Sequence, residues 1–205
     1  MLFRSNLLYI KSKIRFLNAT TIHREIEVYI NDNLVVESMK FADLTDYKIV
    51  PPGVHEIKVY SKGNRQRPLF EKTIDVAPNT NYTMSIVDVE AALDNLILRD
   101  GEEGDFKENS NLRFINLSKN APLMSLSLLN DVILFESVEY LETTNYYELS
   151  SGIYNFKITY LDNTIIAKTI SNKVLENGKF YTIYVLGLFN GNPPMGYMMV
   201  EDKNA

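Results

Sequence analysis

Hydrophobic and polar residues alternate along most of this chain. Residues 26–30 and 124–128 are apolar at every second position, which is the period of a strand with one buried face. Asn31-Asp32 follows the first run directly and Asn130-Asp131 follows the second after Leu129, and both residue types tolerate the left-handed backbone of hairpin turns. The pattern predicts seven or eight short strands in each half, with turns about every 8 to 12 residues. A single weak helical signal predicts one turn of helix at residues 89–95.

A thirteen-residue block occurs twice, at residues 47–59 and 146–158. Both copies read Tyr, five residues, Gly, Val or Ile, two residues, Ile or Phe, Lys, and Val or Ile. We interpret each block as strand, turn, strand, in which Gly53 or Gly152 supplies the positive φ that a tight hairpin needs. Further similar segments flank both blocks in the same order, so the chain is predicted to contain a duplicated domain.

The predicted fold class is all-β, with two tandem Ig-like/transthyretin-like antiparallel β-sandwich domains. We expect an N-terminal arm at residues 1–12, the first sandwich at 13–100, a polar linker at 101–111 and the second sandwich at 112–205. At roughly 90 residues, each sandwich is large enough to bury a core of its own. We therefore expect separate folding units, and residues 112–205 should melt cooperatively when expressed alone.

Composition and charge narrow the classes of function. The chain is 45% hydrophobic and 23% charged, with a net charge of −5, and the isoelectric point is near 5.2. This acidic balance argues against a general nucleic-acid or anionic-membrane binder, which would carry a basic face. The absence of cysteine excludes disulfides and thiolate zinc sites. The first residues show neither a signal peptide nor a membrane span, so we expect synthesis in the cytoplasm.

No pattern of catalytic or metal-binding residues emerges. His23 and His55 fall at unmatched positions of the repeat, without partners at ligand spacing, and are interpreted as surface or turn residues. The acidic stretch from Asp100 to Glu108 does not fit a calcium loop and is interpreted as a solvated linker. Other acids alternate with apolar residues on strands and are assigned to the solvent face: Glu27, Glu37, Glu71, Glu90, Glu136, Glu139 and Glu142. We expect no enzyme activity and no cofactor or metal.

Tyrosines at matched positions of the repeat are predicted to be structural. Core or corner tyrosines of β-sandwiches bond their hydroxyls to the backbone, and this role is expected of Tyr47, Tyr146, Tyr82 and Tyr181. Arg15 and Arg113 are also matched, and each is interpreted as pairing with a matched acid at a sheet edge or the domain interface. Unmatched tyrosines are candidates for contact surfaces instead: Tyr147, Tyr154 and Tyr197.

The N-terminal arm is a candidate for self-association. Leu7, Leu8, Tyr9 and Ile10 are consecutive apolar residues, and the matching place before the second sandwich is polar. Such a segment puts side chains on both faces of a strand. It either folds back over its own domain or adds to an edge strand of a neighbour, and we favour the second. Deletion of residues 1–11 should then remove an oligomer and leave the melting temperature intact.

The landmarks together resemble the bacterial domain-of-unknown-function family 4397. They are the Arg-Phe-Leu/Ile-Asn openings, the alternating strands ending in Asn-Asp, the Tyr-x5-Gly blocks and the late Tyr-Thr strands at Tyr82 and Tyr181. The resemblance implies two consecutive domains of this family, without an established activity, and an origin in a spore-forming Gram-positive bacterium. We therefore expect a non-catalytic structural or interaction protein with protein partners, part of a bacterial surface or spore-coat assembly. The alternative is a carbohydrate- or peptide-binding module.

Overall fold

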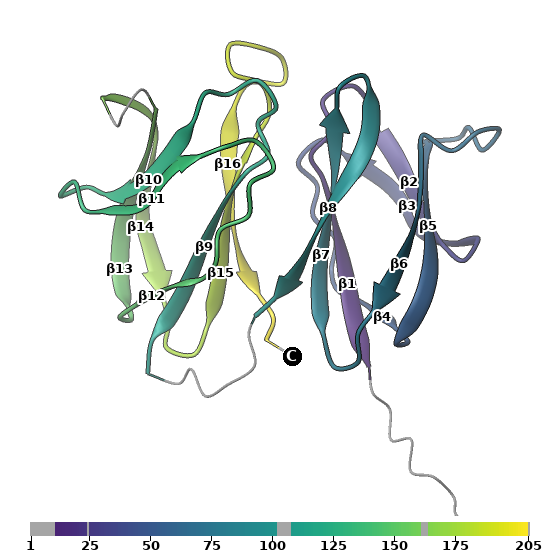
Figure 1. Cartoon of the computed structure of the whole chain (residues 1–205), viewed down its shortest axis with the longest axis horizontal. Helices are drawn as coiled ribbons and strands as arrows, with labels where there is room; N and C mark the ends of the chain where they lie inside the picture. Colours follow the sequence, from purple (N-terminus) through teal and green to yellow (C-terminus); the bar gives the residue numbers. More distant parts are fainter. Residues whose placement is uncertain (1–10, 24, 102–107, 161–163, 205) are drawn as a thin grey trace, which may run out of the picture.

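A computed structural model describes residues 11–23, 25–101, 108–160 and 164–204, which form two β-sandwiches (Figure 1). The strands of the first are β1 (Ser12–Asn18), β2 (Glu25–Ile30), β3 (Asn33–Lys40), β4 (Lys48–Val50), β5 (Gly53–Ser61), β6 (Phe70–Val76), β7 (Asn81–Val89) and β8 (Ala92–Asp100). Those of the second are β9 (Ser110–Asn116), β10 (Met124–Leu128), β11 (Ile133–Val138), β12 (Tyr147–Leu149), β13 (Gly152–Tyr160), β14 (Ile165–Leu175), β15 (Phe180–Leu186) and β16 (Gly196–Asp202). The predicted all-β fold with two sandwiches is confirmed.

Each sandwich stacks two four-stranded sheets, and the strand order is the same in both. The sheets of the first are β4-β1-β7-β8 and β3-β2-β5-β6, and those of the second are β12-β9-β15-β16 and β11-β10-β13-β14. Neighbouring strands are antiparallel except for β1 with β7 and β9 with β15, which are parallel. Alternation of hydrophobic residues did not reveal these parallel pairs, because it is the same in either direction.

Alternating side chains fill a separate core inside each sandwich. In the first, Ile26 and Val28 of β2 pack with Ile14 and Phe16 of β1 in one buried cluster, and the second sandwich has a matching cluster. The β2–β3 turn places Asn31 and Asp32 at φ values of 48° and 61°. These are the two left-handed positions of a two-residue hairpin turn.

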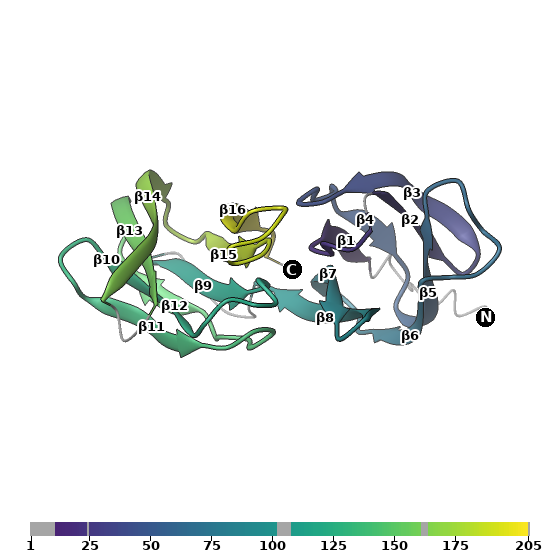
Figure 2. The ribbon, with the colours of Figure 1, turned by 90° about the horizontal axis from the view of Figure 1, so that it is seen from above.

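Central strands β1 and β9 are buried on both faces. On β1, Ile14 and Phe16 face the core of the first sandwich, so Arg15 and Leu17 point to the opposite face of the sheet. That face lies against the second sandwich, as Figure 2 shows from above. A third buried cluster joins apolar residues of both sandwiches: Leu17, Ala19, Val87, Ile115, Leu117, Tyr184 and Leu186.

Two local predictions are wrong. Residues 89–95 form no helical turn, because β7 continues to Val89 and β8 begins at Ala92, with Glu90 at φ 52° in a tight turn between them. Gly53 has φ 116°, but Gly152 lies outside the left-handed region. The two hairpins of the repeated block are therefore not conformationally equivalent at their glycines.

Some predictions fall on segments that the structure leaves undescribed. Leu7, Leu8, Tyr9 and Ile10 of the arm lie outside the described residues, as do residues 102–107 of the linker. Within the described ranges, no helix is long and apolar enough to cross a membrane.

Candidate functional site at the interface of the two sandwiches

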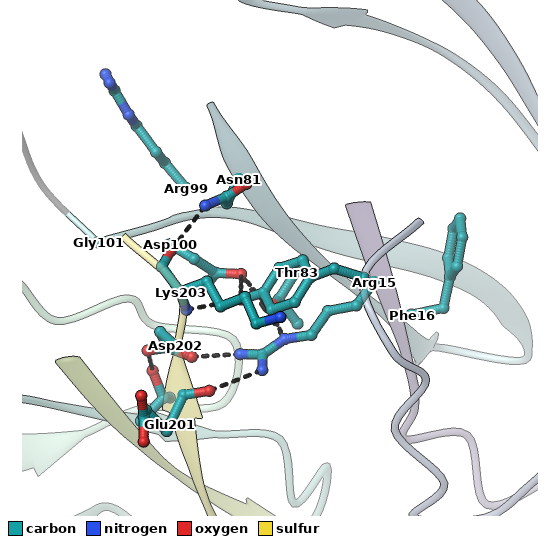
Figure 3. Close-up of polar contacts among 12 residues, drawn as sticks. Arg15, Phe16, Asn81, Thr83, Arg99, Asp100, Gly101, Glu201, Asp202 and Lys203 are labelled. Atoms are coloured by element: carbon teal, nitrogen blue, oxygen red, sulfur yellow. Dashed lines mark hydrogen bonds and ion pairs between the residues drawn. The ribbon is translucent and has the colours of Figure 1, made fainter. Parts of the chain in front are cut away.

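Arg15 of the first sandwich binds the last strand of the second (Figure 3). Its Nη2 donates to the carboxylate of Asp202 on β16, and its Nη1 donates to the backbone carbonyl of Glu201 at 3.0 Å. The remaining donor, Nε, is 2.8 Å from Thr83 Oγ1 on the neighbouring β7. The guanidinium is therefore hydrogen-bonded at all three nitrogens, partly within its own sandwich and partly across the interface.

Arg113 of the second sandwich makes the same contacts in reverse. Its Nη2 donates to Asp100 Oδ1 at 2.8 Å, and its Nη1 donates to the carbonyl of Arg99 at 2.9 Å. Its Nε is 2.9 Å from Thr182 Oγ1. The two arginines and two aspartates thus form a pair of reciprocal ion pairs related by a pseudo-twofold axis between the sandwiches.

The tyrosines that open the repeated block complete each ion pair. The Tyr47 hydroxyl donates to Asp100 Oδ2 at 2.8 Å, and the Tyr146 hydroxyl donates to Asp202 Oδ2 at 2.8 Å. Each ring lies under an arginine, with the guanidinium carbon 4.6 Å from the ring centroid in both cases. Each hydroxyl also accepts a backbone N–H of the other sandwich, from Lys203 to Tyr47 and from Gly101 to Tyr146.

All four charged side chains of this cluster are buried, with no more than 4% of any residue exposed. Burial and the neighbouring carboxylate of Asp202 raise the pKa of Asp100, against the two arginines and Thr83. Burial alone would lower the pKa of Arg113, but Tyr146, Asp202 and Asp100 raise it overall. Burial and the adjacent aspartates also raise the pKa of the Tyr47 and Tyr146 phenols. The arginines therefore stay charged, and the tyrosines stay protonated donors.

Such an arrangement is suited to holding two domains together. Two positive and two negative groups cancel, and every carboxylate accepts hydrogen bonds from several donors, which is what a buried ion pair requires. The cluster is closed to solvent and offers no free nucleophile or base. Around it lies the apolar cluster shared by the two sandwiches.

A comparison with protein families places the chain. Residues 12–127 match the family described as Domain of unknown function (DUF4397). The chain belongs to this family. The DUF4397 match begins with β1, spans the first sandwich and continues through β9 into β10 of the second. No relative is found among curated proteins.

In this DUF4397 protein the matched tyrosines bond in two ways. Tyr82 accepts the backbone N–H of Ala77 at 3.3 Å, and Tyr181 accepts that of Glu176 at 3.2 Å, so both anchor the preceding turn. Tyr47 and Tyr146 were expected to bond only the backbone, and their main partners are instead the interface carboxylates. The sequence contained every residue of the cluster, but the repeat alone did not show which acid meets which arginine.

The three tyrosines predicted as a contact surface are not brought together. Tyr147 and Tyr197 are exposed on β12 and β16, the opposite edges of one sheet. Tyr154 lies on β13 of the other sheet, stacks on Phe156 and donates its hydroxyl to the carbonyl of Ser150. Tyr154 is therefore part of its own sandwich's packing.

Three residues predicted to be exposed are buried. His55 accepts from the Asn31 side chain at Nδ1 and donates from Nε2 to the carbonyl of Pro51, so it stabilises a turn from inside. Glu27 accepts from the Gly63 backbone and the Tyr29 hydroxyl, and the Gly63 hydrogen bond is the main cause of its lowered pKa, against its burial. Asp100 belongs to the interface cluster.

The other acids assigned to the solvent face are exposed, as predicted: Glu37, Glu71, Glu90, Glu136, Glu139 and Glu142. Within the described part of the chain, no group of three or more His, Asp and Glu side chains is placed to hold a metal ion.

The second sandwich carries an open cleft apart from the interface. It has a volume of about 330 Å³ and is lined by Tyr160, Lys168, Phe189, Asn190, Pro194 and Met195, among others. The rings of Tyr160 and Phe189 meet edge to face, with centroids 5.2 Å apart. Aromatic, amide and ammonium groups in one cleft can contact a polar ligand that has an apolar face.

Proposed function

We propose that this protein is a non-catalytic structural or interaction protein of a bacterial surface or spore-coat assembly. The observation that carries the proposal is the interface cluster. Its two arginines and two aspartates are buried and paired with one another across the two sandwiches. A protein in which buried ion pairs hold two domains together is suited to a mechanical or scaffolding role.

We further propose that the second sandwich is a second copy of the DUF4397 domain. Support comes from the interface, where each contact of Arg15 has a counterpart at Arg113 with the same atoms. Both sandwiches also share one strand order, including the parallel pair. Reciprocal contacts of this kind are expected when a duplicated domain packs against its own copy.

Localisation tests the proposed role. A tagged copy is followed through growth and sporulation, and we expect it to collect at the cell or spore surface in a large assembly. The Arg15→Ala/Arg113→Ala variant should lose incorporation, whereas Lys72→Ala, which removes an exposed pair with Asp94, should not. A wild-type protein that stays in the cytosol unattached to any larger assembly would contradict the proposal.

The cleft beside Tyr160 favours a second candidate, a carbohydrate- or peptide-binding module. An aromatic face beside amide and ammonium groups suits the stacking and hydrogen bonding of a sugar ring. A glycan array should then detect binding of micromolar strength that Tyr160→Ala abolishes. Tyr197→Ala, on β16 outside the residues lining the cleft, is the matched control. Equal binding by both variants, or none by the wild type, rejects this candidate.

A further inference from the structure

The two faces that meet at the interface share a central set of polar residues. Arginine stands on β1 and β9, threonine on β7 and β15, and aspartate at the ends of β8 and β16, with matching hydrogen bonds. The contacts of this central Arg-Thr-Asp set are therefore self-complementary. They would be satisfied equally by the unlike pair seen here, by two copies of the first sandwich, or by two copies of the second. Outside this set the two faces differ: Asn81, which donates to the carbonyls of Lys203 and Asn204 across the interface, matches Phe180, and Tyr140, which donates to the carbonyl of Asp88, matches Phe41.

Three matched positions of the two faces have larger side chains in the second sandwich, whereas Leu17 and Ile115 are of equal size and Leu98 is larger than its match Val200. Ala19 and Leu117 each lie four residues after a matched arginine. Ser85 and Tyr184 each lie two residues after a matched threonine, and Val87 and Leu186 each lie four residues after it. At each of the three positions, the second sandwich has the larger side chain. At these three positions the first face therefore has room where the second face projects.

These six residues all lie in the interface. On β7, Met84 and Ile86 belong to the core of the first sandwich, so Ser85 and Val87 point to the opposite face. The five apolar members of the set share one buried cluster that spans both sandwiches. Ser85 and Tyr184 are completely buried, and their hydroxyls have no hydrogen-bond partner among the described residues. Bulk and not hydrogen bonding is what distinguishes this matched pair.

Size differences at matched positions select one of the three pairings. Two second sandwiches would bring the larger side chains of these three positions together and overpack the interface. Two first sandwiches would bring the smaller ones together and leave cavities. Only the unlike pair combines the large set with the small set, in the way that built-in clashes and voids create specificity elsewhere.

We infer that the interface face of the first sandwich is a docking surface specific for the second sandwich, with Leu117, Tyr184 and Leu186 as the specificity-determining residues. The partner that this face accepts is the second sandwich of its own chain or of another copy. Two copies of the chain therefore join through these faces only by reciprocal exchange of sandwiches. This inference stands independently of the proposed cellular role.

A cut chain tests the specificity directly. A protease site replaces residues 102–107, and the folded protein is cut there so that both halves start as the native pair. Light and isotopically heavy preparations are mixed, in urea just below the unfolding transition, until their halves have exchanged. Native mass spectrometry then counts the pairs. We expect each like pair at less than a tenth of the unlike pair, and a like pair at or above a tenth overturns the inference.

A size exchange tests the three residues themselves. In the cut chain, Leu117→Ala/Tyr184→Ser/Leu186→Val gives the second half the side chains of the first, and the ratio of second–second to unlike pairs should rise at least tenfold. Adding Ala19→Leu/Ser85→Tyr/Val87→Leu to the first half should restore the preference for unlike pairs. An unchanged ratio in a triple variant that circular dichroism shows to be folded overturns the assignment. If the triple variant does not fold, the ratio of like to unlike pairs in the cut wild-type chain alone decides whether the inference stands.

Discussion

At the scale of single residues, the presence of a hydrogen-bond partner separates the hydroxyl groups that stabilise the interface from those that do not. Tyr47 donates to a buried carboxylate, whereas the hydroxyl of Tyr184 is buried without a hydrogen-bond partner among the described residues. A hydrogen bond to a charged group is worth more than one between neutral groups, and an unpaired buried hydroxyl is unfavourable. The same substitution should therefore have opposite effects at these two tyrosines.

Tyr47→Phe should lower the free energy of unfolding by about 1.5–3 kcal/mol, because Asp100 loses a donor. Tyr184→Phe should leave it unchanged or raise it slightly. Urea denaturation followed by circular dichroism compares the two variants with the wild type. Equal losses in both would contradict this distinction between the two hydroxyl groups.

Glycine substitutions should distinguish the two copies of the repeated block. Gly53→Ala places a side chain at φ 116° and should destabilise the protein by about 1 kcal/mol or more. Gly152→Ala should be close to neutral, because its Cβ would meet only Tyr154 Cε2 at 3.6 Å. Thermal melts of both variants provide the measurement. A large loss at Gly152 would contradict the backbone geometry described for β13.

At the scale of elements, the sequence showed where strands lie but not what covers them. Alternation in β2 and β10 and the Asn-Asp turn after β2 were predictable, because strand period and turn chemistry are local. The second buried face of β1 was not, because a polar Arg15 between apolar neighbours is also the pattern of a solvent-facing position. The burial of Glu27 and His55 was not predictable for the same reason, since Gly63, Asn31 and Pro51, which bond them, come from other parts of the chain. The sequence predicted that Arg15 pairs with a matched acid at a sheet edge or the domain interface, but it did not identify that acid as Asp202.

The packing of strand β9 in the interface depends on Arg113, because its charge balances the buried carboxylate of Asp100. Arg113→Ala would leave the carboxylate of Asp100 buried without its closest cation, and losing one partner of a buried pair costs about 3–5 kcal/mol. We expect a loss of this size in urea denaturation. Lys157→Ala, which removes a pair with the exposed Asp131, should cost less than about 1 kcal/mol. A loss below that level for Arg113→Ala would mean that water reaches Asp100.

At the scale of the whole molecule, buried tyrosines make stability depend on alkaline pH. Burial raises the pKa of Tyr47, Tyr146 and Tyr184 above its usual value. In the unfolded chain tyrosine ionises near about pH 10, so the folded state then binds more protons. The stabilising contribution is fully present below that pH and is lost as the pH rises further.

Urea midpoints measured from about pH 9 to pH 11 should therefore fall steeply with rising pH. In the Tyr47→Phe/Tyr146→Phe variant the slope should be shallower, although its midpoint at pH 9 should be lower. A variant with the wild-type slope would contradict the assignment of raised pKa values to these two phenols.

At this scale, we expect the two sandwiches to unfold together. Residues 112–205 were predicted to melt cooperatively when expressed alone, and this stays a prediction. In the intact chain, however, the face carrying Arg113 and Tyr184 is covered by the first sandwich, and the apolar cluster there contains residues of both. Separation would expose apolar surface and unpair four charges, so we expect neither sandwich to unfold independently of the other.

Hydrogen exchange of Arg113→Ala, followed by mass spectrometry, tests this most directly. Arg113 lies in the second sandwich, and the informative peptides are those of β2 and β5, in the sheet of the first sandwich that faces away from the interface (Figure 2). Our account predicts that protection in β2 and β5 falls by as much as in β13 and β15, whereas Lys157→Ala changes neither. Loss of protection confined to residues 110–204, with β2 and β5 at wild-type rates, would contradict it.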